Sequence, residues 1–377
     1  MIRVVHLLPM LLQKDGPSNG IFNLLKAPQS QVEWAGVWSL RRAPEERDPG
    51  ELLTKLGVDG ATFDMRSPFI DPVVILRLVK KLREVRPDVL QCHLVRANLY
   101  GRLAAKLAAV PVVVNTVHNE EEYFTSPALP SRAARWAEFQ TQSCVSAFVA
   151  VSKASRAAYS QAMGIPQEKI RVIYSGVDMS AMAPRRSQRE CRSSLGLPDG
   201  VPLIVSVGRL HPQKNYAMLV RCAAAMKAHQ PTAVFAVAGD GPEHRNLMQM
   251  ARDLDVASSF RVLGRIDDVQ TLISSADLFV LSSSYEGLPL ALIEAMAQGI
   301  PCVSTDVGGI SEVNLSGRPC TLVPSYDQDA LVRELLSLLD DNTGREAQGR
   351  LAQEVARRWF SSEVMMRSYV ELYQSLM

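Results

Sequence analysis

Short apolar runs alternate with amphipathic stretches along nearly the whole chain. In the first half, we expect buried strands at residues 2–8, 31–40, 60–64, 88–93, 110–118, 147–152 and 169–176. Between them, residues 72–85 and 97–109 carry apolar positions at the three- to four-residue spacing of helices. This alternation predicts βαβ units and a parallel sheet.

The alternation then pauses and restarts. Residues 175–202 are rich in Gly, Pro, Ser and Arg, which is typical of a domain linker. Further strands are expected at 202–208, 233–239, 260–264, 276–282, 301–305 and 320–324, with helices at 216–229, 269–275 and 329–341. Because 377 residues exceed one ordinary core, we predict two doubly wound Rossmann-like α/β domains, at 1–184 and 185–360. Ligands bind at the carboxyl ends of such strands, so the domains are expected to face each other across a cleft.

Composition narrows the class of protein. No apolar run reaches 18 residues, since the best candidate, 103–117, is broken by Lys106 and Pro111, so we expect no membrane span. Residues 3–8 fit a first strand better than a signal peptide, because no small-residue cleavage site follows. The six cysteines are scattered without a C-x-x-C pair, which favours the cytoplasm and argues against zinc.

Charge is uneven although the net value is only +2. Residues 1–184 carry 22 Lys and Arg against 17 Asp and Glu, a net of +5, and residues 185–377 a net of −3. Residues 75–87 concentrate the positive charge. This stretch is either the solvated face of a helix or a surface for an anionic membrane or a phosphate-bearing acceptor. We expect no nucleic-acid partner.

The stretch 282–309 carries two glutamates in an apolar setting. Glu286 follows the strand at 276–282, and a helix is expected from Pro289, in its first turn, to Gly299. Free N–H groups at the start of that helix suit an anion. They lie around Gly287 to Leu290, and Gly287, Leu288, Pro289 and Leu290 are counted with the donor site. Glu286 is then placed to accept hydrogen bonds from sugar hydroxyls and Glu294 from a ribose diol. The alternative is two solvated helix glutamates.

A second motif, SVGRLHPQKN at 206–215, follows the strand at 202–208. Gly208 suits the turn, Arg209 and Lys214 suit a diphosphate, and Asn215 suits a helix N-cap. A basic loop of this kind also occurs on surfaces without a ligand. Weaker signals follow later strands. Gly239 and Gly241 are weak evidence for nucleotide binding, and the segment with Arg265 and Ile266 could present backbone groups to a nucleobase. The backbone of Gly308 and Gly309 could approach the ligand.

Together these motifs resemble the retaining nucleotide-sugar glycosyltransferases of the GT-B fold, family 4. The sequence motifs match this family densely over residues 200–315. Elsewhere only the order of the predicted strands and helices matches. The resemblance implies that Glu286 and Glu294 are the family's E-x7-E pair, reading donor sugar and ribose, and that Arg209 and Lys214 are its diphosphate clamp. It also implies that the last helix, 361–377, packs back on the first domain.

The first domain is expected to supply the remaining contacts. His118 ends a strand where the family commonly has a sugar-site histidine, although a satisfied core histidine is the alternative. His93, Asn19 and Asn119 are candidates for the acceptor side. The loop around Gly16 resembles a Gly-Pro-x-Asn variant of the family's Gly-Gly loop and is counted with the donor site.

The sequence therefore predicts a cytoplasmic, hexosyl-type glycosyltransferase. It would move a sugar from a nucleoside-diphosphate sugar, with UDP favoured, to a glycan or lipid-linked acceptor with retention. His118, Arg209, Lys214 and Glu286 are the predicted catalytic residues. We expect neither cofactor nor metal, because no Asp-x-Asp motif lies in a suitable loop. A nucleotide-sugar epimerase of the same fold and a non-catalytic nucleotide-binding protein are the alternatives.

Overall fold

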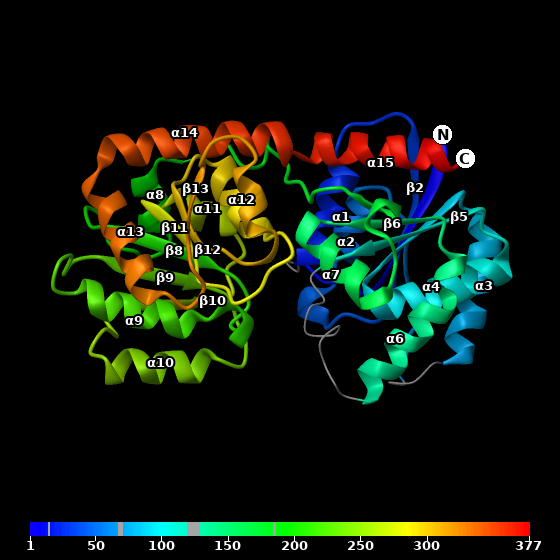
Figure 1. The fold of residues 1–377 in the computed structure, drawn as a ribbon, viewed down its shortest axis with the longest axis horizontal. Coiled ribbons are helices and arrows are strands. Elements are labelled where there is room, and N and C mark those ends of the chain that lie inside the picture. Colours follow the sequence, from blue (N-terminus) through cyan, green and yellow to red (C-terminus); the bar gives the residue numbers. More distant parts are fainter. Residues whose placement is uncertain (14–15, 67–70, 119–128, 184–185) are drawn as a thin grey trace. The chain divides into compact units, whose positions relative to one another are not determined.

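The computed structural model describes residues 1–13, 16–66, 71–118, 129–183 and 186–377. The chain forms two compact units (Figure 1). Unit 1 comprises Met1–Gly176 and Ser362–Met377, and unit 2 comprises Val177–Ser361. Each is built on its own parallel sheet flanked by helices, so the predicted α/β class with two Rossmann-like domains is confirmed.

Seven strands make the sheet of unit 1, in the order β3-β2-β1-β4-β5-β6-β7. They are β1 Ile2–Met10, β2 Val32–Arg41, β3 Gly60–Thr62, β4 Val89–His93, β5 Val112–Val117, β6 Ala147–Ala150 and β7 Ile170–Val172. All pairs are parallel. The strand order reverses between β1 and β4, and the carboxyl edge at such a reversal is where doubly wound sheets bind ligands.

Helices cover both faces of this sheet. They are α1 Gly16–Lys26, α2 Gly50–Lys55, α3 Pro72–Val85, α4 Leu94–Ala108, α6 Leu129–Thr141, α7 Lys153–Met163 and α15 Ser362–Leu376. The Asp71 side chain caps α3, accepting hydrogen bonds from the backbone N–H groups of Val73 and Val74. On one face, Tyr369 and Tyr373 of α15 pack into a buried cluster with valines of β1, β4 and β5.

Unit 2 repeats the arrangement with six strands in the order β10-β9-β8-β11-β12-β13. These are β8 Leu203–Val207, β9 Val234–Ala238, β10 Phe260–Gly264, β11 Leu278–Leu281, β12 Cys302–Thr305 and β13 Cys320–Val323. Its helices are α8 Gln188–Ser194, α9 Tyr216–Met226, α10 His244–Asp253, α11 Val269–Ser274, α12 Leu290–Ala297, α13 Gln328–Asp340 and α14 Asn342–Trp359. Its strand order reverses between β8 and β11.

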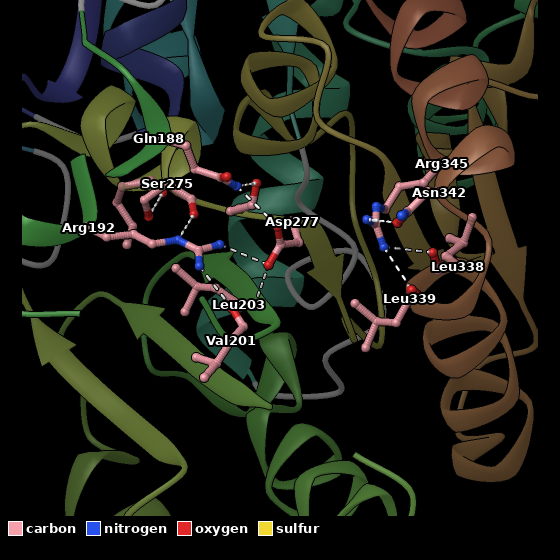
Figure 2. Close-up of polar contacts among 12 residues, drawn as sticks. Gln188, Arg192, Val201, Leu203, Ser275, Asp277, Leu338, Leu339, Asn342 and Arg345 are labelled. Carbon is pink, nitrogen blue, oxygen red and sulfur yellow. Dashed lines mark hydrogen bonds and ion pairs between the residues drawn. The ribbon is translucent and has the colours of Figure 1, made fainter. Parts of the chain in front are cut away.

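The expected linker at 175–202 is largely ordered structure of unit 2. Its α8 starts with a capping box between Ser187 and Glu190. Figure 2 shows how Arg192 of α8 is held, with its guanidinium 2.8 Å from Asp277 and 2.9 Å from the carbonyls of Ser275 and Val201. The passage between the units at 176/177 falls inside this stretch as expected, but its Gly, Pro and Ser content also reflects the caps and turns of a docked helix.

The chain passes between the units at 176/177 and again at 361/362. The two passages lie side by side, because the N–H of Val177 donates to the carbonyl of Phe360 at 2.9 Å and Val177 bridges Ser361. On the unit 1 side, Asn23 donates to the Gly176 carbonyl at 2.9 Å. Helix α15 contacts α1 and belongs to unit 1.

Candidate functional site

In unit 2, the loops after β8 and β11 are joined at the carboxyl edge where the strand order reverses. The hydroxyl of Ser282 donates to the carbonyls of Lys214 and Asn215, at 2.9 and 3.1 Å. The backbone N–H of Ser284 donates to the Gln213 carbonyl at 2.7 Å, and the Gln213 amide donates back to the Tyr285 carbonyl at 3.0 Å. Two of the motifs identified in the sequence therefore form one structural feature.

Glu286 and Lys214 form an ion pair in this feature. The Glu286 residue is 7% exposed, and its carboxylate also accepts a hydrogen bond from the Ser283 hydroxyl at 2.7 Å. Arg209, from the same basic loop, is exposed. The structure thus joins one member of the predicted clamp to the first glutamate, while Arg209 lies at the solvent-facing end of the loop.

Several glycines in the motifs fit tight backbone packing. A Cβ atom on Gly239 would lie 1.9 Å from the Gly208 carbonyl oxygen, and one on Gly241 2.3 Å from the Leu210 carbonyl oxygen. A Cβ atom on Gly308, whose φ is +54°, would lie 1.8 Å from the Glu286 carbonyl oxygen. These glycines pack the site loops against one another, which is a reason for their presence that the sequence did not reveal.

Helix α12 carries the second glutamate. It begins at Leu290 with Pro289 at the N-cap, one residue earlier than the first-turn position expected for the proline. Gly287, Leu288 and Pro289 are buried. Glu294 is half-buried, and burial raises the pKa of its carboxyl to about 7. The two glutamates therefore differ, since Glu286 is paired with a cation and burial holds the pKa of Glu294 above its usual value.

The remaining donor-side candidates of unit 2 are at the same edge. Gly264 ends β10, and its carbonyl accepts from the Gly239 N–H at 2.8 Å. Arg265 is exposed and Ile266 half-buried just beyond it. Asn215 occupies the N-cap position of α9, but it is left-handed, with φ of 48°, and its side chain makes no capping hydrogen bond. The expected N-cap position of Asn215 is therefore confirmed, although its side chain does not cap the helix.

Three histidines form a chain of contacts that reaches the carboxyl edge of the unit 1 sheet. His6 on β1 is 3.0 Å from His93 at the end of β4, measured from Nδ1 to Nε2. His93 is in turn 3.1 Å from His118, just after β5, again from Nδ1 to Nε2. Leu94, with φ of 68°, turns the chain sharply from β4 into α4 directly after His93. Both predicted histidines thus lie at strand ends and touch each other.

The other candidates of unit 1 are less well supported. Gly16 and Asn19 lie in the first turns of α1, where a loop was expected. A Cβ atom on Gly16 would meet nothing within 4 Å, so packing does not require glycine there. Asn119 lies outside the described residues. Among the described residues, no group of three or more His, Cys, Asp or Glu side chains could hold a metal ion.

Comparisons with known proteins agree with this geometry. The profile "Glycosyl transferases group 1" matches residues 187–356, and "Glycosyltransferase Family 4" matches residues 32–181. EpsF of Bacillus subtilis, named as a predicted glycosyltransferase, is 30% identical over 312 residues, covering 81% of this chain and 79% of EpsF. The chain is a GT-B glycosyltransferase of the family 4 type.

Other relatives of this glycosyltransferase are named more specifically. The "UDP-Gal:alpha-D-GlcNAc-diphosphoundecaprenol alpha-1,3-galactosyltransferase" of Escherichia coli is 28% identical over 271 residues, covering 71% of this chain and 70% of that protein. Matches to some other curated relatives span only about half of those proteins, 53–55%. The crystal structure of Anabaena Alr3699/HepE in complex with UDP-glucose has a TM-score of 0.84, at 20% identity over 100% of both chains.

Family membership makes the glycosyltransferase an enzyme of the transferase class, so the epimerase alternative receives no support. None of the helices among the described residues is both long and apolar enough to cross a membrane.

Sequence reasoning missed several residues that shape the site of the glycosyltransferase. Ser282 and Ser283 hold the basic loop and Glu286, and Thr305 donates to the Ser283 carbonyl at 2.7 Å. The run of three serines after a buried strand was the available signal, because hydroxyls there can satisfy loop carbonyls. His6 gave no local signal, since it lies within a buried strand.

Proposed function

We propose that the enzyme transfers a sugar, with retention, from a nucleoside-diphosphate sugar to a hydroxyl of a glycan or lipid-linked acceptor. The favoured donor is a UDP sugar. We propose that the enzyme acts in the synthesis of bacterial surface polysaccharide or lipid-linked glycan. Support comes from the activity for which the E. coli relative is named and from the UDP-glucose complex of the Anabaena protein.

The observation that carries this proposal is the Lys214–Glu286 ion pair at the reversal point of the second sheet. As the bond from the sugar to the diphosphate breaks, negative charge grows on the leaving group. Lys214 is proposed to stabilise that charge together with Arg209. Glu286 would accept hydrogen bonds from donor hydroxyls, and Glu294 from the ribose. The anomeric carbon gains oxocarbenium character, as in glycoside hydrolysis.

Donor binding is tested by thermal and urea unfolding with UDP-, GDP- and ADP-sugars. A donor at 100 times its dissociation constant should stabilise the protein by about 2.7 kcal/mol. Lys214→Met should lose most of this gain. Lys227→Met is the matched control, because Lys227 forms an exposed ion pair with Asp255 in the same unit. Wild-type protein that no nucleotide sugar stabilises would overturn the proposal.

Turnover separates a catalytic role for Lys214 from a binding role. Lys214→Ala should lower kcat by about 10²–10³-fold, because the lost interaction strengthens in the transition state. The anomeric configuration of the product, followed by proton NMR, tests retention, and an inverted product would exclude it. We also propose that no metal is required, so activity should be unchanged after exhaustive EDTA treatment.

A membrane-facing surface in unit 1 is the second part of the proposal. Helix α6 exposes Trp136 and Phe139, 67% and 50%, three residues apart and next to the exposed Arg132. Helix α3 exposes Leu76 beside Arg77. Both helices pack against α4, as Figure 1 shows within unit 1. Exposed aromatic and cationic groups suit the interface of an anionic bilayer, so we propose that this face rests on the cytoplasmic leaflet.

Vesicle co-sedimentation tests the surface. Wild-type protein should bind vesicles of anionic lipid at low salt and dissociate at high salt. Trp136→Ser with Phe139→Ser should abolish binding, while Tyr326→Ser, which removes an exposed aromatic of unit 2, should not. Equal binding to neutral vesicles, or binding by the double variant, would contradict the proposal.

A further inference from the structure

The line of histidines in unit 1 has a property that none of its members has alone. His6, His93 and His118 come from three adjacent strands, β1, β4 and β5, and are joined by two nitrogen-to-nitrogen contacts of 3.0 and 3.1 Å. His6 is fully buried, His93 is 3% exposed, and His118 is half-buried. The line therefore leads from the interior of the sheet to its carboxyl edge.

All three rings are neutral near pH 7. Burial lowers the pKa of His6 to about 3 and that of His118 to about 4. The pKa of His93 lies well below its usual value, because of burial and then of its two neighbouring rings. A neutral imidazole carries one N–H and one bare nitrogen. Each of the two contacts must then contain one proton to be a hydrogen bond.

These conditions leave two arrangements of protons. In the first, His6 donates from Nδ1, His93 donates from Nδ1, and His118 carries its proton on Nδ1. In the second, His118 donates from Nε2, His93 donates from Nε2, and His6 carries a proton on Nε2. The tautomer of His118 is thus coupled to that of His6, two strands away.

The inner end of the line favours the first arrangement. Nε2 of His6 is buried and has no hydrogen-bond partner among the described residues. A buried N–H without an acceptor is rarer in proteins than a bare acceptor. The Trp34 ring lies 5.3 Å from the His6 ring, centroid to centroid, and its buried Nε1–H also lacks a partner among the described residues. Because an indole N–H can only donate, Trp34 offers no acceptor for a proton on Nε2 of His6.

We propose that His6 and His93 are positioning residues that fix His118 as the Nδ1–H tautomer, so that its outer nitrogen donates a hydrogen bond to a ligand oxygen. The ligand part rests on the proposed function, because the oxygen belongs to the nucleotide sugar or its acceptor. In this arrangement His118 cannot serve as a general base through Nδ1, since that nitrogen has no free electron pair. A donor is the group that a hydroxyl or developing oxyanion requires.

The tautomers are measured directly on the full chain by long-range proton–nitrogen NMR with labelled histidine. Wild-type protein without ligand should show protonated Nδ1 on all three residues. His229, an exposed histidine of unit 2, is the internal control for the solution tautomer. A protonated Nε2 on His118 would overturn the proposal, and this reading does not depend on whether the donor is a nucleotide sugar.

Variants test the coupling. His93→Leu should move His118 toward the tautomer of His229. His6→Asn, whose amide can donate where Nδ1 did, should keep His118 as Nδ1–H, while His6→Leu should not. In turnover, His118→Ala and His93→Leu should each lower kcat/KM by about 3–10-fold, the effect of one hydrogen bond. The double variant should fall no further. Fully multiplicative losses, or an unchanged His118 tautomer in His6→Leu and His93→Leu, would refute the positioning role.

Discussion

Glu294 provides the sharpest test of the donor site, because its protonation should be linked to binding. The carboxyl is half-buried on α12, and burial raises its pKa to about 7. If it accepts hydrogen bonds from ribose hydroxyls, the bound form must be the carboxylate, since the ionised group has the greater accepting capacity. Donor binding should then release a proton at acidic pH.

The magnitude follows from that pKa. At pH 6 roughly one molecule in eleven carries the carboxylate, and at pH 8 roughly ten in eleven. Apparent affinity scales with the competent fraction, so the dissociation constant should fall about tenfold, or about 1.4 kcal/mol, between pH 6 and 8. Glu294→Gln should flatten this dependence, because an amide does not titrate in the range.

Titration calorimetry with a nucleotide sugar measures both the dissociation constant and the number of protons released. The diphosphate of the nucleotide sugar is esterified at both ends, so it does not titrate between pH 6 and 8. Runs in two buffers of different ionisation enthalpy should give about 0.9 protons released per ligand at pH 6 and about 0.1 at pH 8. Glu354→Gln, at an exposed position of α14, should behave like wild type. A pH-independent affinity in wild type, or an equal slope in Glu294→Gln, would refute this reasoning.

The same shift affects stability in the unliganded protein. The folded pKa of about 7 lies above the unfolded value of 4.5, so the folded state keeps a proton that the unfolded state has lost between these pH values. The contribution is present below pH 4.5 and is lost as pH rises through 7. The change in the free energy of unfolding amounts to about 3 kcal/mol. Glu294→Gln should remove this dependence of stability on pH.

Two further predictions concern unit 1 and the thiols. Glu138→Gln should lower the free energy of unfolding by about 3–5 kcal/mol, because it leaves the fully buried Arg102 without its charge partner, 3.6 Å away. The double change Arg102→Met with Glu138→Leu should cost far less in urea unfolding, and an equal loss would contradict this. Burial raises the pKa of the Cys92 and Cys222 thiols to about 12, so in native protein iodoacetamide should label the half-buried Cys144 alone, as mass spectrometry can check. Native labelling of a second cysteine would count against the packing described.

The fold was accessible from the sequence because strands buried on both faces are nearly continuous apolar runs. The edge positions of Lys214, Glu286 and His118 followed from where those runs end. The Lys214–Glu286 pair and the His6 contact did not follow, because both depend on which strands are neighbours. Strand order is set by crossovers that the spacing of residues does not reveal. Helix α8 was missed because its capping residues are the same types that make linkers.

The membership of α15 in unit 1 has a consequence for synthesis on the ribosome. Tyr373 donates to Gln91 in the middle of the first sheet, and Met366 and Leu372 complete its buried cluster. Unit 1 therefore lacks one wall of its core until residues 362–377 have emerged. At about 5–20 residues per second, about 10–40 s separate the emergence of Gly176 from that of the final helix. Unit 2, continuous in sequence, is complete once Ser361 has emerged, before the final helix. The segment made first thus becomes complete last, and its open sheet face is the surface that chaperones would meet during translation.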